Sequence, residues 1–337
     1  MKRLLLALGA LLVLALIGTM LTAWWYLDTD EVKAPVLAGH VEQGSLAHGG
    51  RQRKWHAYIP GSRPADPALV LILHGSTGDG KSMLATTWHE FNILAEQEGF
   101  IAVYPDGFER HWNDCRASAA YSANQLDIDD VGFLAALVRE FTAKHGVDPM
   151  RVYAVGLSNG GQMAYRLALE TPGLVAAVAA IAANLPVEGN MDCEPSGEPV
   201  ATLIINGTED PVNPYNGGLV QIFGDSTRGH VLSASETARY WAELAGYSDP
   251  GQKKVWADRA PDDGTTIESI IWSTSGAPPV ALITVVGGGH TIPHTRYRMP
   301  RLLGRTSHEF DATRLIWAFF SGKEFPTQAL VREERDQ

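Results

Sequence analysis

The stretch GLSNGG at residues 156–161 places Ser158 between glycines two positions before and two positions after it. An apolar run, RVYAV, precedes it, and a segment with helical periodicity follows. A serine on a sharp strand-to-helix turn exposes its hydroxyl, and flanking glycines let the backbones approach closely. The pattern therefore predicts that Ser158 is a nucleophile. The alternative is that Ser158 only caps the helix, which serine does well.

A serine nucleophile needs an imidazole that accepts its proton and a carboxylate that orients this imidazole. The segment ATLIINGTEDP ends one apolar run with Glu209 and Asp210, and ALITVVGGGH ends another with His290. The order serine, acid, histidine is the one found in a large class of serine hydrolases. We therefore predict a triad of Ser158, Asp210 and His290. The alternative for Asp210 is that it only starts the turn at Pro211.

A serine nucleophile that attacks a carbonyl carbon also needs two backbone N–H groups that stabilise the oxyanion of the tetrahedral intermediate. One comes from the residue after the nucleophile, here Asn159. The second N–H group comes from the loop after an early strand. In the stretch LILHGSTG, Ser76 directly follows Gly75 at this place. Ser76 and Asn159 are therefore the predicted oxyanion hole.

The same loop also satisfies the phosphate-binding pattern G-x-x-x-x-G-K-[ST], with Gly75, Gly80, Lys81 and Ser82 in place. A nucleotide-binding P-loop protein is therefore an alternative. It would need an acidic metal ligand after a second strand, for which only Asp106 lies nearby, and it leaves the triad unexplained. A third hypothesis is a hydrolase-like fold that has lost activity and only binds a polymer or a partner.

Short apolar runs alternate with helical segments through most of the chain, and the loops named above follow such runs. This alternation predicts an α/β protein with a mostly parallel central sheet covered by helices on both faces. The runs expected as buried strands are residues 69–73, 100–104, 152–155, 174–182, 201–205 and 281–286.

The N-terminus carries Lys2 and Arg3, an apolar run of about 20 residues at positions 4–23, and then aromatic residues. This predicts an N-terminal apolar helix, favoured as an uncleaved signal anchor, with a cleaved signal peptide as the alternative. An anchored chain would face the periplasm from the inner membrane, and a cleaved one would be periplasmic or secreted. The predicted organisation is residues 1–27 as anchor or signal, 28–48 as tether, 49–325 as catalytic domain and 326–337 as charged tail.

The composition restricts the partners. The chain has 27 Lys and Arg and 38 Asp and Glu, which gives a net charge of −11. Because it also has no basic block, the composition argues against nucleic acid as a partner. Cys115 and Cys193 are the only cysteines, and neither has the spacing of a metal site. An exported protein could pair them as a disulfide, and two buried thiols are the alternative. No metal or organic cofactor is predicted, and the oligomeric state is left open.

The chain resembles secreted α/β-hydrolase esterases of the polyhydroxybutyrate depolymerase and feruloyl esterase type. The resemblance implies an α/β-hydrolase fold and an exported serine esterase that acts on hydroxyalkanoate oligomers or on feruloyl or acetyl esters. Ile292 stands where the family usually has a tryptophan, so it is a candidate substrate contact; Trp112 in HWND is another, or is packed in the core. The matching stretches are LILHGSTG, GFIAVYPDG, HWND, DDVGFLAALV, GVDPMRVYAVGLSNGGQMAYRLA, INGTEDPVNPYNGG, GGGHTIP and GRTSHEFDATRLIWAFF.

Overall fold

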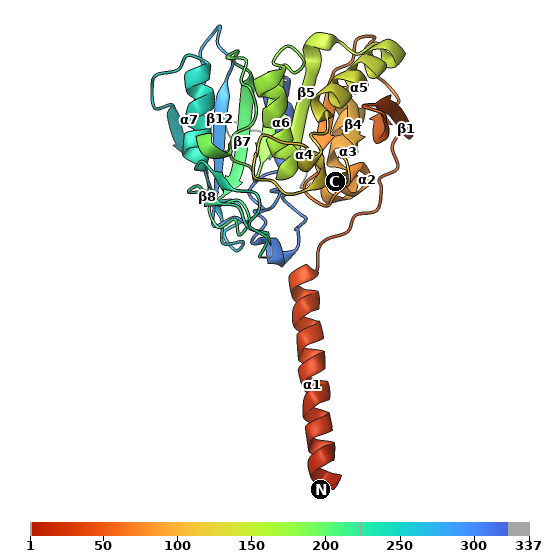
Figure 1. Cartoon of the computed structure of the whole chain (residues 1–337), viewed down its shortest axis with the longest axis vertical. Helices are drawn as coiled ribbons and strands as arrows, with labels where there is room; N and C mark the ends of the chain where they lie inside the picture. Colours follow the sequence, from red (N-terminus) through yellow and green to blue (C-terminus); the bar gives the residue numbers. More distant parts are fainter. Residues whose placement is uncertain (1, 223, 323–337) are drawn as a thin grey trace.

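A long mixed sheet forms the centre of the molecule in the computed structural model, which describes residues 2–222 and 224–322 (Figure 1). Five neighbouring pairs in its middle are parallel, and the pairs at both edges are antiparallel. In spatial order the strands are β1 (His40–His48), β2 (Arg51–Ile59), β4 (Ile101–Pro105), β3 (Leu69–Leu73), β5 (Val152–Leu157), β6 (Ala177–Ile181), β7 (Ala201–Gly207), β12 (Val280–Val286), β11 (Thr266–Trp272) and β10 (Gln252–Val255). A separate short pair joins β8 (Gly218–Leu219) to β9 (His230–Val231).

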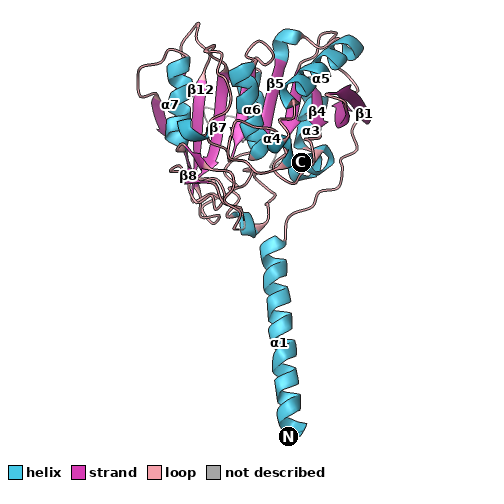
Figure 2. Cartoon of the chain, viewed as in Figure 1, coloured by secondary structure: helices cyan, strands magenta, loops and turns pink. Residues whose placement is uncertain are grey.

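Helices cover both faces of this sheet, as predicted (Figure 2). One face packs against α5 (Asp130–His145), α6 (Asn159–Glu170) and α7 (Ala234–Leu244), and the other against α2 (Gly80–Thr86), α3 (Glu90–Glu98) and α8 (Ala312–Phe320). The remaining helices are α1 (Lys2–Leu27), α4 (Ser122–Gln125), and three short 3₁₀ turns, η1 (Pro149–Arg151), η2 (Glu188–Asn190) and η3 (Arg301–Leu303).

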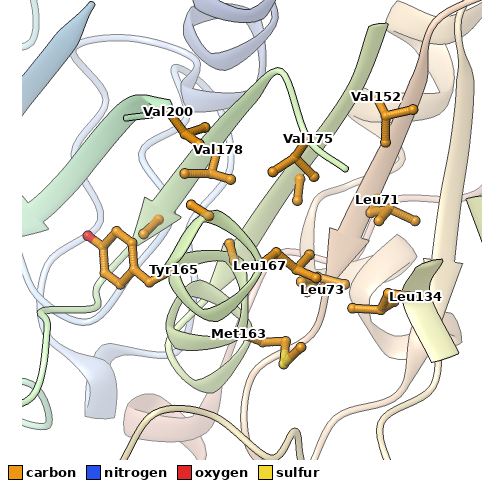
Figure 3. Close-up of a cluster of buried hydrophobic side chains, with 14 of the residues drawn as sticks. Leu71, Leu73, Leu134, Val152, Met163, Tyr165, Leu167, Val175, Val178 and Val200 are labelled. Atoms are coloured by element: carbon orange, nitrogen blue, oxygen red, sulfur yellow. The ribbon is translucent and has the colours of Figure 1, made fainter. Parts of the chain in front are cut away.

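Helix α6 lies against the centre of the sheet, because its apolar side chains fill the space above β3 and β5. Met163 and Leu167 of α6 are buried with Leu71 and Leu73 of β3, and Leu134 of α5 joins the same cluster (Figure 3). Strands β3 to β7 are buried on both faces, which is why they are nearly unbroken apolar runs in the sequence. This packing holds the start of α6, and therefore Ser158, at the carboxyl edge of the sheet.

The predicted tether at residues 28–48 is too long at its C-terminal end. Strand β1 pairs with β2 over nine residue pairs, from His40 opposite Ile59 to His48 opposite Arg51. Its side chains alternate between half-buried and exposed. An edge strand of this kind is polar, and it was therefore not recognised as part of the sheet. The predicted tail at 326–337 lies outside the described residues.

The apolar N-terminal segment forms α1, which projects away from the domain (Figure 1). The chain after α1 is held by the domain, since Arg298 forms an ion pair with Asp28 and its backbone N–H donates to the Asp30 carboxylate at 2.9 Å. The choice between an anchor and a cleaved signal stays a prediction. In the part of the chain whose side chains are described, no helix combines the length and apolar character needed to cross a membrane.

A disulfide joins Cys115 to Cys193, the pairing that the sequence left open. The two Cα atoms lie 4.9 Å apart and the bond links positions separated by 78 residues. Both residues are buried. The bond ties the loop after β4 to the segment after η2.

We expect the double variant Cys115→Ala/Cys193→Ala to lose about 4 kcal/mol of unfolding free energy, because a loop of this length is no longer closed in the unfolded chain. Urea denaturation of the oxidised wild type and the variant measures the difference. A reductant should destabilise the wild type and leave the variant unchanged. A loss below about 1 kcal/mol would contradict the prediction.

Candidate active site

Ser158 occupies a strained turn between β5 and α6. Its backbone angles are φ 54° and ψ −117°, in a region that residues with a side chain seldom adopt. Its N–H donates to the carbonyl of Ile181 at 2.8 Å. The hydroxyl makes no capping hydrogen bond to the helix, which argues against the alternative that Ser158 only caps α6. The side chain is partly exposed at the carboxyl end of β5.

The glycines on either side are required by close backbone contacts. A Cβ atom on Gly156 would lie 2.1 Å from the carbonyl carbon of Gly160. One on Gly160 would lie 2.3 Å from the carbonyl oxygen of Leu73. Both distances are far below van der Waals contact, so a side chain at either position would displace the backbone. The GLSNGG spacing therefore reflects the packing of this turn against β3.

Asp210 and His290 meet in a buried hydrogen bond. The Asp210 Oδ2 atom lies 2.7 Å from His290 Nδ1, and the two side chains are 1% and 7% exposed. The other carboxylate oxygen accepts from the N–H groups of Val212 and Asn213 at 2.7 and 2.8 Å. Asp210 therefore forms the turn and orients the imidazole at the same time. With the proton on Nδ1, the lone pair on His290 Nε2 can accept another.

The parallel pairing of β7 with β12 brings these two loops together. The N–H of Glu209 donates to the carbonyl of Gly288 at 2.8 Å, and the N–H of His290 donates to that of Leu303 at 2.6 Å. Glu209, the other acidic residue of its loop, is exposed and forms an ion pair with Arg305. The structure therefore brings Asp210, rather than Glu209, to the imidazole.

The loop after β3 lies beside Ser158. A Cβ atom on Gly75 would stand 3.5 Å from the Cβ of Ser158 and 3.3 Å from the carbonyl oxygen of Leu157. Ser76 follows directly, and its hydroxyl oxygen is buried without a hydrogen-bond partner in the described part of the chain. Asn159 is fully buried at the first position of α6. The structure therefore brings both predicted oxyanion residues to the turn that carries Ser158.

His74 is buried and holds this loop in place. Its Nε2 accepts from the N–H of Gly107 at 2.9 Å, so the proton resides on Nδ1, which lies 2.8 Å from the carbonyl oxygen of Gly75. Burial lowers the pKa of the His74 imidazole to about 4, against a smaller upward effect from its hydrogen bond to Gly75. His74 is therefore a neutral structural group. The sequence alone did not predict this role, because the only feature that points to it is the position of His74 directly before Gly75.

The phosphate-binding pattern does not form a phosphate site. Asp79 caps α2 by accepting from the Ser82 N–H at 2.7 Å, and the Asp79 N–H donates to the Ser82 hydroxyl. The N–H of Gly80 donates to Asp106 at 2.7 Å. The backbone N–H groups that a phosphate would need are thus already bonded to carboxylates, and the negative charge of these carboxylates would repel a phosphate. Lys81 is exposed.

The two predicted substrate contacts are buried. Trp112 is 0% and Ile292 1% exposed, so neither side chain lines an open surface. The Trp112 indole instead donates to the carbonyl of His74 at 2.9 Å, and Ile292 belongs to the apolar core on the α8 face. For Trp112 this burial agrees with the alternative of a residue packed in the core, because an aromatic residue near a site has the same sequence signal whether it faces substrate or core.

Among the residues that the structure describes, no group of three His, Cys, Asp or Glu side chains could hold a metal ion. Other histidines are engaged in packing or hydrogen bonds. His111 stacks on Tyr121 with ring centroids 4.7 Å apart, and buried His294 accepts from the N–H groups of Arg296 and Tyr297.

The fold and this arrangement of loops define an α/β-hydrolase. A solved structure of an acetyl xylan esterase from Aspergillus awamori superposes with a TM-score of 0.51 at 21% identity, covering 76% of this chain and 96% of that one. This likeness concerns the fold alone.

Sequence comparisons identify the kind of enzyme. Residues 55–191 match the family described as Esterase PHB depolymerase. A putative esterase, NocK, from Nocardia uniformis subsp. tsuyamanensis is 29% identical over 304 residues, covering 87% of this chain and 86% of the relative. Feruloyl esterase B from Piromyces equi is 29% identical over 242 residues, covering 66% of this chain and 42% of the relative. Poly(3-hydroxyalkanoate) depolymerase C from Paucimonas lemoignei is 26% identical over 263 residues, covering 70% of this chain and 58% of the relative.

The chain is therefore a serine esterase, and it is similar to α/β-hydrolase esterases of the polyhydroxybutyrate depolymerase and feruloyl esterase type. It spans about two fifths of the fungal feruloyl esterase and somewhat over half of the depolymerase.

We expect His74 to make stability pH-dependent. Because its pKa in the folded chain, about 4, lies below the ordinary 6.5, the unfolded chain binds more protons between these values and stability falls as pH is lowered through this window. At 1.36 kcal/mol per pKa unit the loss is about 3 kcal/mol. Urea unfolding of the wild type and His74→Gln should show that their difference in free energy shrinks by this amount from pH 7 to pH 4.

An NMR titration of the imidazole resonances provides the independent check. Resonances of His74 that move with a midpoint near pH 6.5 would contradict the assignment of a neutral, buried ring.

Proposed function

We propose that Ser158 is the nucleophile of ester hydrolysis, that His290 is its general base and that Asp210 orients His290. The observation that carries this proposal is the buried hydrogen bond between Asp210 and His290, on loops that leave the same edge of the sheet as the strained Ser158 turn. An imidazole held in one tautomer by a carboxylate is the arrangement that activates a serine hydroxyl.

The reaction then follows from these groups. The Ser158 oxygen attacks the ester carbonyl carbon while its proton passes to His290 Nε2. The tetrahedral intermediate collapses, the alcohol leaves with that proton, and an acyl-serine remains. His290 next takes a proton from water, whose oxygen attacks the acyl carbon, and the acid is released as Ser158 regains its proton. Asp210 stabilises the imidazolium in both halves without being protonated itself.

The N–H groups of Ser76 and Asn159 are proposed to stabilise the oxyanion. The contact of the Gly75 loop with Ser158 supports this assignment, as does the position of Asn159 at the start of α6, where the amides have no partner within the helix. Losing one such donor typically slows an enzyme about 100-fold to 1000-fold.

We expect Ser158→Ala to lower kcat for p-nitrophenyl butyrate at least about 10⁴-fold, and Asp210→Asn to lower it about 10⁴-fold through the wrong imidazole tautomer. A fluorophosphonate should label the wild type at Ser158, as located by peptide mass spectrometry. Lys81→Ala is the matched control, and it should retain wild-type activity because Lys81 is exposed.

Two outcomes would contradict the proposal. ATP hydrolysis that survives Ser158→Ala and is lost in Lys81→Ala would favour the nucleotide-binding alternative. A wild type that neither hydrolyses short esters nor reacts with the fluorophosphonate would favour a hydrolase-like binding protein.

For the substrate we propose hydroxyalkanoate oligomers or feruloyl or acetyl esters. The support is the likeness to relatives whose names are feruloyl esterase and poly(3-hydroxyalkanoate) depolymerase.

Release of 3-hydroxybutyrate from a hydroxybutyrate trimer, of ferulate from methyl ferulate and of acetate from acetylated xylo-oligosaccharides should differ in kcat/KM by at least about 100-fold between the preferred ester and the poorest one, because the acyl pocket discriminates among them. Hydrolysis of p-nitrophenyl butyrate with no turnover of any of the three classes would contradict this substrate proposal and leave the triad standing.

We further propose that the chain is exported by its N-terminal segment. The disulfide between Cys115 and Cys193 supports an oxidising compartment. Sequencing the N-terminus of the protein recovered outside the cytoplasm determines whether α1 is retained, and recovery in the cytoplasm alone would contradict export.

A further inference from the structure

We propose that Trp112 is a positioning residue that aligns both backbone amides of the oxyanion hole. This inference rests on the proposed function, because it assigns to Trp112 the task of holding Ser76 and Asn159. Trp112 lies in the loop after β4, and its side chain is fully buried. It makes three hydrogen bonds, two through its backbone to Asn159 and one through its indole to His74.

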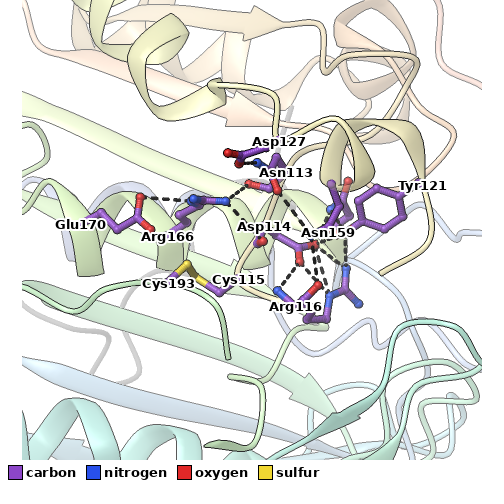
Figure 4. The surroundings of a disulfide bond; sticks show 11 residues. Asn113, Asp114, Cys115, Arg116, Tyr121, Asp127, Asn159, Arg166, Glu170 and Cys193 are labelled. Atoms are coloured by element: carbon purple, nitrogen blue, oxygen red, sulfur yellow. Dashed lines mark hydrogen bonds and ion pairs between the residues drawn. A yellow bond between two sulfur atoms is a disulfide. The ribbon is translucent and has the colours of Figure 1, made fainter. Parts of the chain in front are cut away.

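The first half of the alignment concerns Asn159. The N–H of Trp112 donates to Asn159 Oδ1 at 2.8 Å, and Asn159 Nδ2 donates to the carbonyl of Trp112 at 3.0 Å. The same Nδ2 lies 2.5 Å from the Asp114 carboxylate and 3.2 Å from the Tyr121 hydroxyl (Figure 4). Every polar atom of the Asn159 side chain is therefore engaged, which fixes the first residue of α6 and the direction of its backbone N–H.

The second half concerns Ser76. The Trp112 indole Nε1 donates to the carbonyl of His74 at 2.9 Å, and the rings of Trp112 and His74 pack with centroids 5.0 Å apart. His74 Nδ1 in turn holds the carbonyl oxygen of Gly75 at 2.8 Å. In a planar trans peptide the N–H of the next residue points opposite to that carbonyl. Holding the Gly75 oxygen therefore sets the direction of the Ser76 N–H.

The Trp112 loop is itself rigid. Asp114, two residues on, forms a fully buried ion pair with Arg116 and accepts from the Tyr121 hydroxyl at 2.5 Å. Cys115 between them carries the disulfide to Cys193 (Figure 4). This rigid loop forms hydrogen bonds both to Asn159 and to His74, which precedes Gly75 and Ser76. It therefore fixes the distance between the two segments that carry the oxyanion amides.

The test is Trp112→Phe, which removes the indole N–H and keeps an aromatic ring in the core. The backbone bonds to Asn159 stay, so the His74 side alone is loosened. Trp241→Phe is the matched control, since Trp241 is equally buried and its indole N–H has no partner within the described residues.

We expect Trp112→Phe to lower kcat ~10-fold to 100-fold with KM within about twofold, because oxyanion donors act in the transition state. The inhibition constant for a trifluoromethyl ketone, which forms a tetrahedral adduct with the serine, should rise by the same factor. Trp241→Phe should change neither quantity more than about threefold. Equal effects of the two variants, or a loss confined to KM, would overturn the proposal.

Two measurements keep the proposal testable if activity is absent or Trp112→Phe does not fold. The backbone amide resonances of Ser76 should move in Trp112→Phe and stay in Trp241→Phe, and unmoved Ser76 resonances would overturn the proposal whatever the enzyme hydrolyses. A wild type without esterase activity would instead refute the proposed function alone. Asn159→Ala, which removes the side chain and keeps the amide, should show the same loss in kcat, and wild-type kcat in that variant would count against the positioning role.

Discussion

The backbone of Ser158 is the constraint on which the rest of the structure depends. A non-glycine residue at φ 54° and ψ −117° costs about 1–3 kcal/mol, and it persists only where its surroundings leave no alternative. Here the apolar face of α6 is buried on β3 and β5, the Ser158 N–H is bonded to β6, and two glycines allow the turn to touch the neighbouring backbone. The strained backbone thus exposes the Ser158 hydroxyl at the edge of the sheet, and the packing of the core prevents the turn from relaxing.

Around this turn several buried polar side chains form hydrogen bonds with one another, which hold each of them in one protonation state and orientation. His74 is held neutral by burial, and Asp210 uses both carboxylate oxygens. The Asp114 and Arg116 ion pair is enclosed beside the disulfide. Buried polar networks are costly when incomplete, and when complete they hold one arrangement of side chains. The proposed chemistry needs this rigidity, because amides that are aligned beforehand need no reorganisation during reaction.

Much of the fold and of the candidate site could be predicted from residue patterns. The buried parallel strands were found because each is a short apolar run, and helices on both faces followed from their alternation. The antiparallel strands β1, β2, β10 and β11 were not predicted, since β1 and β10 are largely polar and exposed and β2 and β11 mix exposed polar with buried residues. Trp112 and Ile292 were candidate substrate contacts in the sequence, and both side chains are buried in the structure. Gly80, Lys81 and Ser82 also fit a phosphate-binding pattern, and the structure places them in the first turn of α2, which Asp79 caps.

The sequence by itself determined what depends on local order: the glycine spacing at the Ser158 turn, the loops that end apolar strands, and the succession of serine, acid and histidine. Only the tertiary structure decided what depends on distance between remote segments. It brought Asp210 rather than Glu209 to His290, joined Cys115 to Cys193, and bonded Trp112 to both His74 and Asn159. The physical reason is that hydrogen bonds and disulfides act only at contact, and contacts between distant parts of a chain arise from the packing of the whole sheet and its helices.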